Sequence, residues 1–302
     1  MAIEASKIEL SLGPVYFNWS PQKLEDFYDR IANEAPIARV HIGEIVCGKR
    51  SPLNAGALAR SAERLRQAGK MVVWSGLIAP VNKRERGMIR DLIATGDEIE
   101  VNEMGGMIHL KGQPFTAGPF LNLYNENALA LMARLGCTRW CARVELPLNS
   151  IRTMARALPT LGTELFGFGR LPLAHSGRCY HARQHGLTKD SCQYVCDRDP
   201  DGASIETLDG EPLLAYNGVQ TLSHSLQVCS MSAKALSEAG VCALRLSPHD
   251  IDMVAVAEAF RDHLDGKLDS EAFVSRLVGY LPGWPISNGY LSGRAGREWV
   301  AI

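Results

Sequence analysis

Short strand-like segments alternate with helical segments along almost the entire chain, and this alternation limits the fold more than any other feature. Eight runs have the short length and apolar character of buried strands. They are Ile8–Leu12, Arg39–Ile42, Met71–Ser75, Glu98–Val101, Phe115–Ala117, Arg139–Val144, Glu164–Phe168 and Ala243–Leu246. Amphipathic segments lie between most of them, and a repeated strand-then-helix order predicts a parallel sheet.

Helix signals support the same order of elements. Ser20 and Pro21 are typical of residues that begin a helix, and Gly69 and Gly136 are typical of residues that follow one. The clearest predicted helices are Gln22–Asn33, Leu53–Ala68, Asn125–Leu135 and Ile251–His263.

Eight parallel strands favour a closed (β/α)8 TIM-like barrel over an open doubly wound sheet. A typical barrel needs about 250 residues, so a chain of 302 residues carries a surplus. The surplus lies between the seventh and eighth strands, and we expect one barrel domain over residues 1–302 with an insertion at 171–241. No glycine-rich phosphate loop follows any strand, which argues further against a dinucleotide-binding sheet.

The overall composition is that of a soluble globular protein, with 46% hydrophobic and 22% charged residues. A formal net charge of −1 supplies no broad basic surface for duplex nucleic acid. No apolar run reaches the roughly 18 residues of a membrane span, and the first residues lack the pattern of a secretory signal. We therefore expect a cytoplasmic protein.

The eight cysteines are the most informative part of the composition, because a reducing cytoplasm keeps them as thiols or metal ligands. Three of them, Cys179, Cys192 and Cys196, lie close together in the expected insertion. Cys192 and Cys196 stand at positions i and i+4, so one helical turn would point both at the same place. Closely spaced thiolates bind soft metals or iron–sulfur clusters.

Most sites of this kind need a fourth ligand, and Cys47 is the best candidate. It follows the second strand and the insertion follows the seventh, so both loops open at the carboxyl-terminal face of a barrel, where active sites lie. The other four cysteines are expected to pack in the interior. These are Cys137 at the end of a helix, Cys141 within a strand, and Cys229 and Cys242.

Spacing alone leaves the identity of the metal open. Four thiolates suit a closed zinc site and also a [4Fe-4S] cluster. The common zinc pattern pairs two short C-x2-C motifs, which this chain lacks, so the long gap between Cys179 and Cys192 fits a cluster better.

Short motifs spread over the whole chain, in the same order, carry a resemblance to a known family. They are Leu12–Val15 with Tyr16 and Trp19, Gly43–Glu44 with Val46–Cys47, Arg139–Cys141, Val144–Leu146, Leu171–Ala174, Ser176–Cys179, Asn217–Thr221 and Arg245–Pro248. Together with the cysteine pattern, they resemble the collagenase-like peptidase family, in its branch that serves oxygen-independent ubiquinone biosynthesis.

The resemblance implies a [4Fe-4S] cluster whose iron is bound by Cys47, Cys179, Cys192 and Cys196. It further implies a heterodimer with the related protein UbiU, as a subunit of a hydroxylase that acts on a ubiquinone precursor without dioxygen. The lipid-binding accessory protein UbiT belongs to the same pathway, and prephenate is the implied hydroxyl donor. Which residues are catalytic, and whether this subunit performs chemistry or relays electrons, stays open.

Peptidase chemistry finds little support in the sequence despite the family's name. The chain lacks the G-x-S-x-G and H-E-x-x-H motifs, and the adjacency of His175 and Ser176 does not make a base face a nucleophile. Two rival functions remain. One is a zinc-stabilised barrel hydrolase or peptidase, and the other is a scaffold subunit whose cluster serves assembly only.

Four polar residues follow the fourth, fifth and sixth strands, namely Glu103, Asn122, Tyr124 and Glu145. They either line a substrate pocket or belong to ordinary solvated loops. Arg50 and Arg178 adjoin cluster cysteines and either stabilise thiolate and sulfide charge or bind an anionic substrate. Surface ion pairing is the other interpretation, and we expect it for Arg50. His41 is expected to fill the barrel interior without a catalytic role.

Overall fold

Eight parallel strands close into a barrel, which confirms the predicted fold class. The computed structural model describes residues 7–301. The barrel strands are β1 (Glu9–Leu12), β2 (Arg39–Ile42), β3 (Met71–Ser75), β4 (Glu98–Val101), β5 (Phe115–Ala117), β6 (Cys137–Cys141), β7 (Gly162–His175) and β11 (Ala243–Leu246). Each strand pairs in parallel with the next, and β11 pairs with both β7 and β1, so the sheet has no open edge in the barrel.

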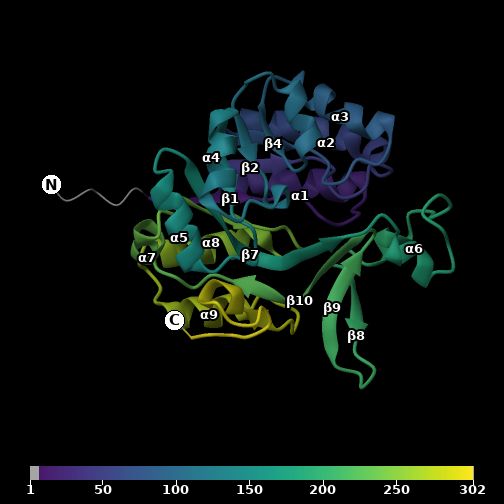
Figure 1. Cartoon of the computed structure of the whole chain (residues 1–302). Helices are drawn as coiled ribbons and strands as arrows, with labels where there is room; N and C mark the ends of the chain where they lie inside the picture. Colours follow the sequence, from purple (N-terminus) through teal and green to yellow (C-terminus); the bar gives the residue numbers. More distant parts are fainter. Residues whose placement is uncertain (1–6, 302) are drawn as a thin grey trace.

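Helices follow most strands and cover the outside of the barrel (Figure 1). They are α1 (Pro21–Glu34), α2 (Ser51–Gln67), α3 (Lys83–Ile93), α4 (Glu126–Arg134), α5 (Leu148–Ala157), α8 (Met253–Leu264) and α9 (Ser270–Val278). The predicted start of α1 is confirmed, since the Ser20 side chain accepts a hydrogen bond from the Lys23 N–H and Pro21 occupies the first turn.

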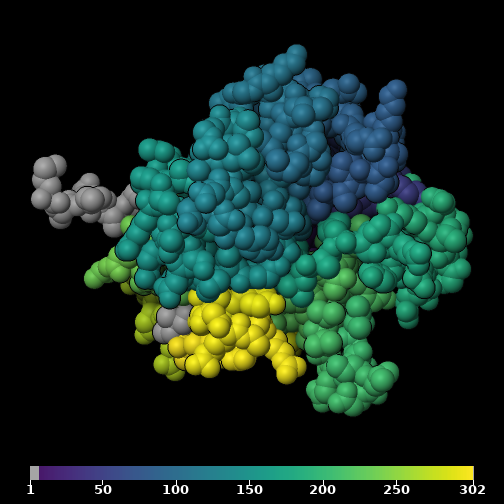
Figure 2. Space-filling view, viewed as in Figure 1, coloured from purple at the N-terminus to yellow at the C-terminus, as the bar shows by residue number. Residues whose placement is uncertain are grey.

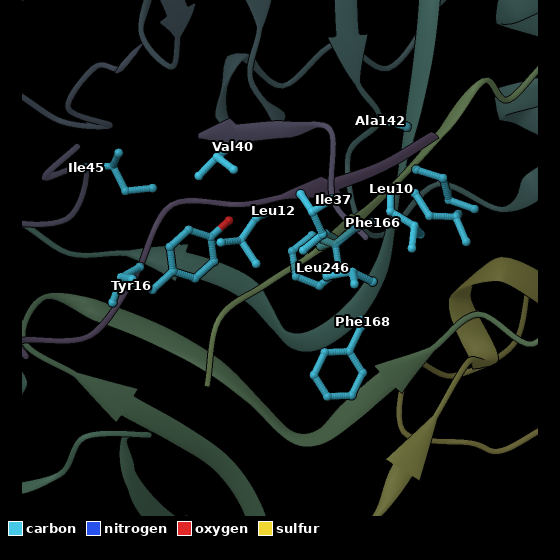
Figure 3. Packing of buried hydrophobic residues seen from close by; sticks show 14 of the residues in the cluster. Leu10, Leu12, Tyr16, Ile37, Val40, Ile45, Ala142, Phe166, Phe168 and Leu246 are labelled. Atoms are coloured by element: carbon cyan, nitrogen blue, oxygen red, sulfur yellow. The ribbon is translucent and has the colours of Figure 1, made fainter. Parts of the chain in front are cut away.

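The two faces of each barrel strand differ in polarity. Leu10, Leu12 and Val40 belong to the buried apolar layer of Figure 3. Residues at alternate positions, among them Ser11 and His41, belong instead to a buried polar network. Successive side chains of a strand point to opposite faces, so one face packs apolar groups while the other gathers polar groups.

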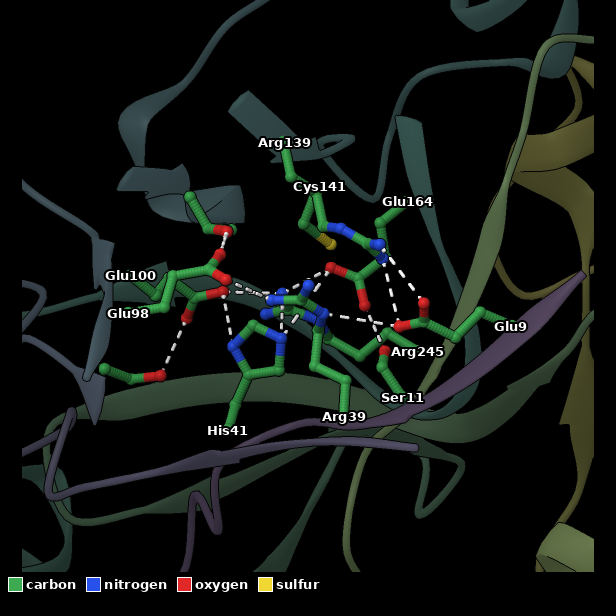
Figure 4. A network of polar contacts seen from close by, with 12 residues as sticks. Glu9, Ser11, Arg39, His41, Glu98, Glu100, Arg139, Cys141, Glu164 and Arg245 are labelled. Atoms are coloured by element: carbon green, nitrogen blue, oxygen red, sulfur yellow. Dashed lines mark hydrogen bonds and ion pairs between the residues drawn. The ribbon is translucent and has the colours of Figure 1, made fainter. Parts of the chain in front are cut away.

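That polar network links five strands through ion pairs (Figure 4). One Arg245 amino nitrogen lies 2.5 Å from a Glu100 carboxylate oxygen and 2.6 Å from a Glu164 carboxylate oxygen. His41 Nδ1 lies 3.1 Å from the Glu100 carboxylate, and the Ser11 hydroxyl donates to Glu164. The predicted placement of His41 in the barrel interior is confirmed, as a residue paired with carboxylates.

The segment between β7 and β11 builds an antiparallel extension of the barrel sheet. β7 continues well beyond the predicted Glu164–Phe168 and pairs antiparallel with β10 (Gln220–Val228), which pairs with β9 (Pro212–Asn217) and then β8 (Ala203–Glu206). The β8–β9 hairpin projects from the body of the molecule (Figures 1 and 2). The same segment holds α6 (Tyr180–Gln184), the 3-10 turn η3 (Val195–Arg198) and α7 (Ala233–Glu238).

Three further 3-10 turns and one short strand complete the elements, namely η1 (Met104–His109), η2 (Pro119–Leu121), η4 (Gly289–Ser292) and β12 (Ile286–Ser287). One predicted boundary is wrong, because Cys137 is the first residue of β6 and does not lie at a helix end. Gly136, at φ 106°, turns the chain out of α4 and allows the strand to begin two residues early. Within residues 7–301, no helix has the length and apolar character needed to cross a bilayer.

Candidate metal centre

The four cysteines predicted as ligands line one small pocket. Cys47 comes from the loop after β2, and Cys179, Cys192 and Cys196 come from the segment after β7. The pocket is also lined by Lys49, Arg50, His181, Lys189, Tyr194, Val195 and Gly218, with no carboxylate among its walls. The structure therefore brings the predicted residues together at the carboxyl-terminal end of the barrel, in a setting of positive charge.

A half-buried carboxylate shapes the loop that carries Cys47. Glu44 accepts hydrogen bonds from the N–H groups of Val46 at 2.9 Å and Cys47 at 3.0 Å. These bonds tie the loop to itself directly after β2 and so fix the backbone of Cys47. Lys49, two residues further, donates to the carbonyls of Lys189 and Asp190, which fastens this loop to the segment that carries the other cysteines.

Cys179 begins α6, where its sulfur accepts a hydrogen bond from the Ala182 N–H at 3.4 Å. This bond fixes the orientation of the Cys179 side chain at the start of the helix.

Cys192 and Cys196 line the same pocket, but the predicted helical turn between them is wrong. Gln193 and Tyr194 take left-handed backbone conformations, at φ 47° and 57°, and η3 begins only at Val195. The Val195 N–H bonds to the Cys192 carbonyl at 3.1 Å, which folds the chain back on itself. The two thiols therefore meet through a tight left-handed turn, and not through the regular rise of a helix.

The thiols of Cys47 and Cys196 are largely withdrawn from water, and burial raises the pKa of both. The guanidinium of Arg50 is the main opposing influence on each thiol pKa. A bound metal would reinforce this effect, because thiolates bind metals while thiols do not.

Arg50 is buried at 1% exposure, so the expected surface ion pair is wrong for this residue. Its two amino nitrogens donate to the Tyr16 carbonyl at 3.2 Å and to the Asn217 side-chain oxygen at 2.6 Å. Asn217 in turn donates to the carbonyls of Cys196 and Asp199, both at 2.8 Å. The Arg50 guanidinium therefore joins the loop after β1 to the end of β9 and, through Asn217, to the cysteine-bearing segment. Arg178, in contrast, is exposed.

Within residues 7–301, no three of the four cysteine sulfurs are grouped as closely as the ligands of a single tetrahedral ion. Among residues 7–301, one group of at least three His, Cys, Asp or Glu side chains has its ligand atoms within 4.8 Å of one another. This group consists of His181, His185 and Asp199, and it contains no cysteine. No three of the four sulfurs therefore come that close together. Zinc–sulfur bonds of about 2.3 Å would require sulfurs roughly 3.8 Å apart in a tetrahedron.

The four remaining cysteines lie outside the pocket, and three of them are buried as predicted, while Cys242 is half-buried. Cys141 lies inside the barrel, Cys229 is fully buried, and the sulfurs of Cys137 and Cys242 donate to backbone carbonyls. Burial raises the pKa of Cys137 and of Cys229 to about 11. These thiols stay protonated at neutral pH and do not line the pocket.

Of the polar residues predicted at the barrel mouth, the structure brings two together. Arg143 donates to the Tyr124 hydroxyl at 3.3 Å and to Glu145 at 2.8 Å. Glu103 instead caps η1 by accepting from the Gly105 N–H, and Asn122 is an exposed left-handed residue after η2. Arg143 was not predicted at this site, because the expected strand Arg139–Val144 included it, whereas β6 ends at Cys141.

The geometry gives no support to a serine nucleophile. The Ser176 hydroxyl accepts a hydrogen bond from the Arg178 N–H at 3.1 Å, and His175 Nε2 is buried without a hydrogen-bond partner among the described residues. Burial, followed by the charges of Arg50 and Arg143, lowers the pKa of His175 to about 4. His175 is therefore neutral at pH 7 and is not bonded to its neighbour.

Comparison with solved structures finds distant barrels. The U32 peptidase Mk0906 aligns with a TM-score of 0.36 at 10% identity, covering 82% of this chain and 87% of that one. N-acetylneuraminate lyase from Mycoplasma synoviae aligns with a TM-score of 0.47 at 7% identity, covering 90% of this chain and 80% of that one. Values this low carry no information about function.

Sequence comparison is more specific. A segment of 130 residues is 27% identical to tRNA hydroxylation protein P of Escherichia coli (strain K12), covering 39% of this chain. The match spans 29% of that relative's length. The sequence profile of peptidase family U32 matches residues 19–300, nearly the whole barrel and the segment that carries the cysteines. The chain therefore belongs to peptidase family U32.

Proposed function

We propose that this chain binds a [4Fe-4S] cluster through Cys47, Cys179, Cys192 and Cys196. The convergence of these four thiols on one cation-lined pocket is the observation that carries the proposal. A cluster ligated by four thiolates has a net negative charge, which Arg50, Lys49 and Lys189 would offset. Residues 171–241 then act as the cluster-binding insertion of a single barrel domain.

The spacing of the sulfurs supports a cluster over zinc. In a cluster each thiolate binds a different iron atom, so the four sulfurs stand farther apart than around one ion. The absence of any three sulfurs within 4.8 Å of one another, in the part of the chain that the structure describes, fits this wider arrangement. A zinc-stabilised hydrolase is the weaker alternative, because Ser176 and His175 form no catalytic pair.

The proposed activity is oxygen-independent hydroxylation in ubiquinone biosynthesis, with UbiU as the partner subunit and UbiT as a lipid-binding accessory. The printed name of the bacterial relative, a tRNA hydroxylation protein, supports a hydroxylation-related role within family U32. The motifs shared with the UbiV branch of the family favour a ubiquinone precursor over RNA as substrate, with prephenate as hydroxyl donor. We place this activity in the cytoplasm.

The cluster would supply one-electron transfer, and the residues of this chain prepare its site. The cysteines hold the iron, and Arg50 lies against Cys196 and Cys47 to favour the thiolate form. Tyr194 closes one side, since its side chain packs at the pocket and its hydroxyl donates to the Lys49 carbonyl at 3.3 Å. Limited water around the cluster strengthens the influence of these nearby charges.

Anaerobic ubiquinone synthesis in a deletion strain tests the function. We expect the wild-type chain and the Cys229→Ala variant to restore the quinone, and Cys196→Ala to fail while still accumulating as folded protein. Affinity capture of UbiU by the wild-type chain tests the partnership. A Cys196→Ala variant that captures UbiU and still restores the quinone would favour the scaffold alternative, in which the cluster is dispensable.

A further inference from the structure

A second group of metal-binding side chains lies beside the cysteine pocket. His181, His185 and Asp199 each offer a ligand atom, and these atoms lie within 4.8 Å of one another. We propose that these three residues bind a divalent first-row transition ion of the zinc or iron(II) class, separately from the cysteines. Two imidazoles and one carboxylate form a ligand set that such ions favour.

The two histidines are arranged to chelate. His181 lies in α6 and His185 follows its last residue, so they stand at positions i and i+4 on adjacent turns. Their rings are nearly parallel, with centroids 5.6 Å apart and an angle of 21° between the planes. This arrangement presents nitrogens from both rings to the same side of the chain.

The contact between His181 and Asp199 has the spacing of two ligands on one ion. His181 Nε2 lies 2.9 Å from the Asp199 Oδ2 atom. Two ligand atoms, each about 2.1 Å from a metal, stand roughly 3.0 Å apart at octahedral angles and roughly 3.4 Å apart at tetrahedral angles, so the contact lies at the short end of this range. The contact is short, yet its direction does not meet the geometry of a hydrogen bond.

Among the described residues, His181 Nδ1 has no hydrogen-bond partner, and Nε2 has the Asp199 carboxylate at 2.9 Å without hydrogen-bond alignment. The His181 side chain is 0% exposed. A buried polar group without a partner costs about 1–3 kcal/mol, so such groups call for an explanation. A metal ion on Nε2 would satisfy one of these nitrogens.

The surroundings suit an exchangeable ion. His185 is exposed and the Asp199 side chain is 35% exposed, so the site opens to solvent on one side. The backbone of Asp199 is fixed, because Asn217 donates to its carbonyl at 2.8 Å. A partly open site leaves room for water or a small ligand on the ion. His181 also lines the cysteine pocket, so the ion would lie next to the proposed cluster.

Zinc binding by anaerobically purified, full-length protein tests the proposal. The protein is treated with a mild chelator and dialysed against micromolar zinc, and zinc, iron and sulfide are then counted separately. We expect about one zinc per chain in the wild type. His185→Ala and Asp199→Asn should each weaken zinc binding more than about tenfold. His109→Ala, a histidine outside the group, should bind as the wild type does.

The outcome does not depend on the cluster proposal. Zinc held by the cysteines would persist in His185→Ala and Asp199→Asn and disappear in Cys196→Ala, which would overturn the second site. Wild-type protein that retains no zinc would overturn it as well. Because His185 is exposed, its replacement should leave the fold intact, and an unchanged circular dichroism spectrum checks this.

Discussion

Arg50 shows how one side chain serves both the fold and the cysteine pocket. It is buried, charged and bonded to Tyr16 and Asn217, two residues far apart in sequence from each other. Among the positive charges around Cys47 and Cys196, it has the largest lowering effect on the pKa of these two thiols. Removing a buried charge of this kind leaves its partners without a donor.

We predict that Arg50→Gln lowers the free energy of unfolding by about 2–4 kcal/mol and reduces the iron content of purified protein. Urea denaturation measures the first effect and iron analysis the second. Arg178→Gln, at an exposed arginine next to a cluster cysteine, is the matched control and should change stability by less than about 0.5 kcal/mol. Equal effects of the two variants would contradict the assigned role of Arg50.

Gly218 is constrained by its backbone and by its neighbour. It is the first residue of the two-residue turn between β9 and β10, at φ 67°, which is typical of glycine in a type II′ hairpin. A Cβ atom there would lie 2.6 Å from an Arg50 amino nitrogen. Gly210 has a similar φ of 83°, but no atom lies within 4 Å of the place where its Cβ would be.

We therefore predict that Gly218→Ala costs more than Gly210→Ala. The control should lose only the backbone strain of about 1–2 kcal/mol, while Gly218→Ala should also displace Arg50 and lower the iron content. Urea denaturation and iron analysis of both variants measure the difference. Normal iron content in Gly218→Ala would contradict the link between this turn and the pocket.

The strands of the barrel are joined by the buried ion pairs among Glu100, Glu164 and Arg245. Burial alone would raise the pKa of Glu164, but Arg245 and then His41 outweigh it and lower the pKa to about 2. The same two partners hold the pKa of Glu100 well below its usual range against the effect of burial. Both carboxylates therefore favour the folded state whenever they are ionised.

The lowered pKa of Glu164 determines how the free energy of unfolding changes with pH. A carboxyl with a lowered folded pKa stabilises above its unfolded pKa of 4.5 and loses this effect as the pH falls towards about 2. For Glu164 the contribution at neutral pH is on the order of 3 kcal/mol. We predict that the free energy of unfolding falls steeply between pH 4.5 and 2, measured by urea denaturation.

Glu164→Gln should be less stable at pH 7 and should show a shallower fall below pH 4.5. Glu238→Gln, at a surface glutamate whose side chain is 65% exposed, should keep the full pH dependence. A Glu164→Gln variant with an unchanged acid profile would mean that the barrel ion pairs contribute nothing to it.

At the level of the whole molecule, the barrel and the antiparallel extension share β7, and the proposed metal ligands come from both sides of this junction. Cys47 belongs to a barrel loop, while Cys179, Cys192 and Cys196 belong to the segment after β7. Lys49 bonds to Lys189 and Asp190 and Tyr194 bonds to Lys49, and a cluster would add further bonds that bridge this segment and the β2 loop. A bound cluster would therefore fasten the extension to the barrel.

We predict that hydrogen exchange slows on cluster loading in residues 176–200 and in the loop around Cys47, while β3 to β5 stay unchanged. Mass spectrometry of loaded and chelator-treated protein measures this. The expectation follows because local opening of a loop is suppressed by a ligand that bridges it to the core. Uniform slowing over the whole chain would contradict a local bridging role.

Much of the architecture was predictable from the sequence because each barrel strand carries its own apolar pattern. Six of the eight strands were placed within one residue of their observed bounds, and the cysteine grouping followed from the topology. The turn between Cys192 and Cys196 was mistaken because left-handed residues at Gln193 and Tyr194 have no signal in the sequence. The burial of Arg50 could not be predicted from local sequence patterns, because its partners lie far away in the chain.

The ion pairs inside the barrel were not predicted, for the same reason. Glu100, Glu164 and Arg245 each sit in a strand with ordinary alternation, and only closure of the barrel brings them into contact. His181 and Asp199 likewise meet only through the fold of the segment after β7. Pairwise contacts between distant positions are not recorded in the spacing of a single sequence.

Iron and acid-labile sulfide in anaerobically purified protein test the central claim most directly. We predict about four iron and four sulfide per chain, with the broad visible absorption of a [4Fe-4S] cluster. Alanine at Cys47, Cys179, Cys192 or Cys196 should abolish both, and Cys229→Ala should keep them. A colourless wild-type protein that contains zinc and no iron, or a cluster that survives the loss of Cys47, would contradict the account.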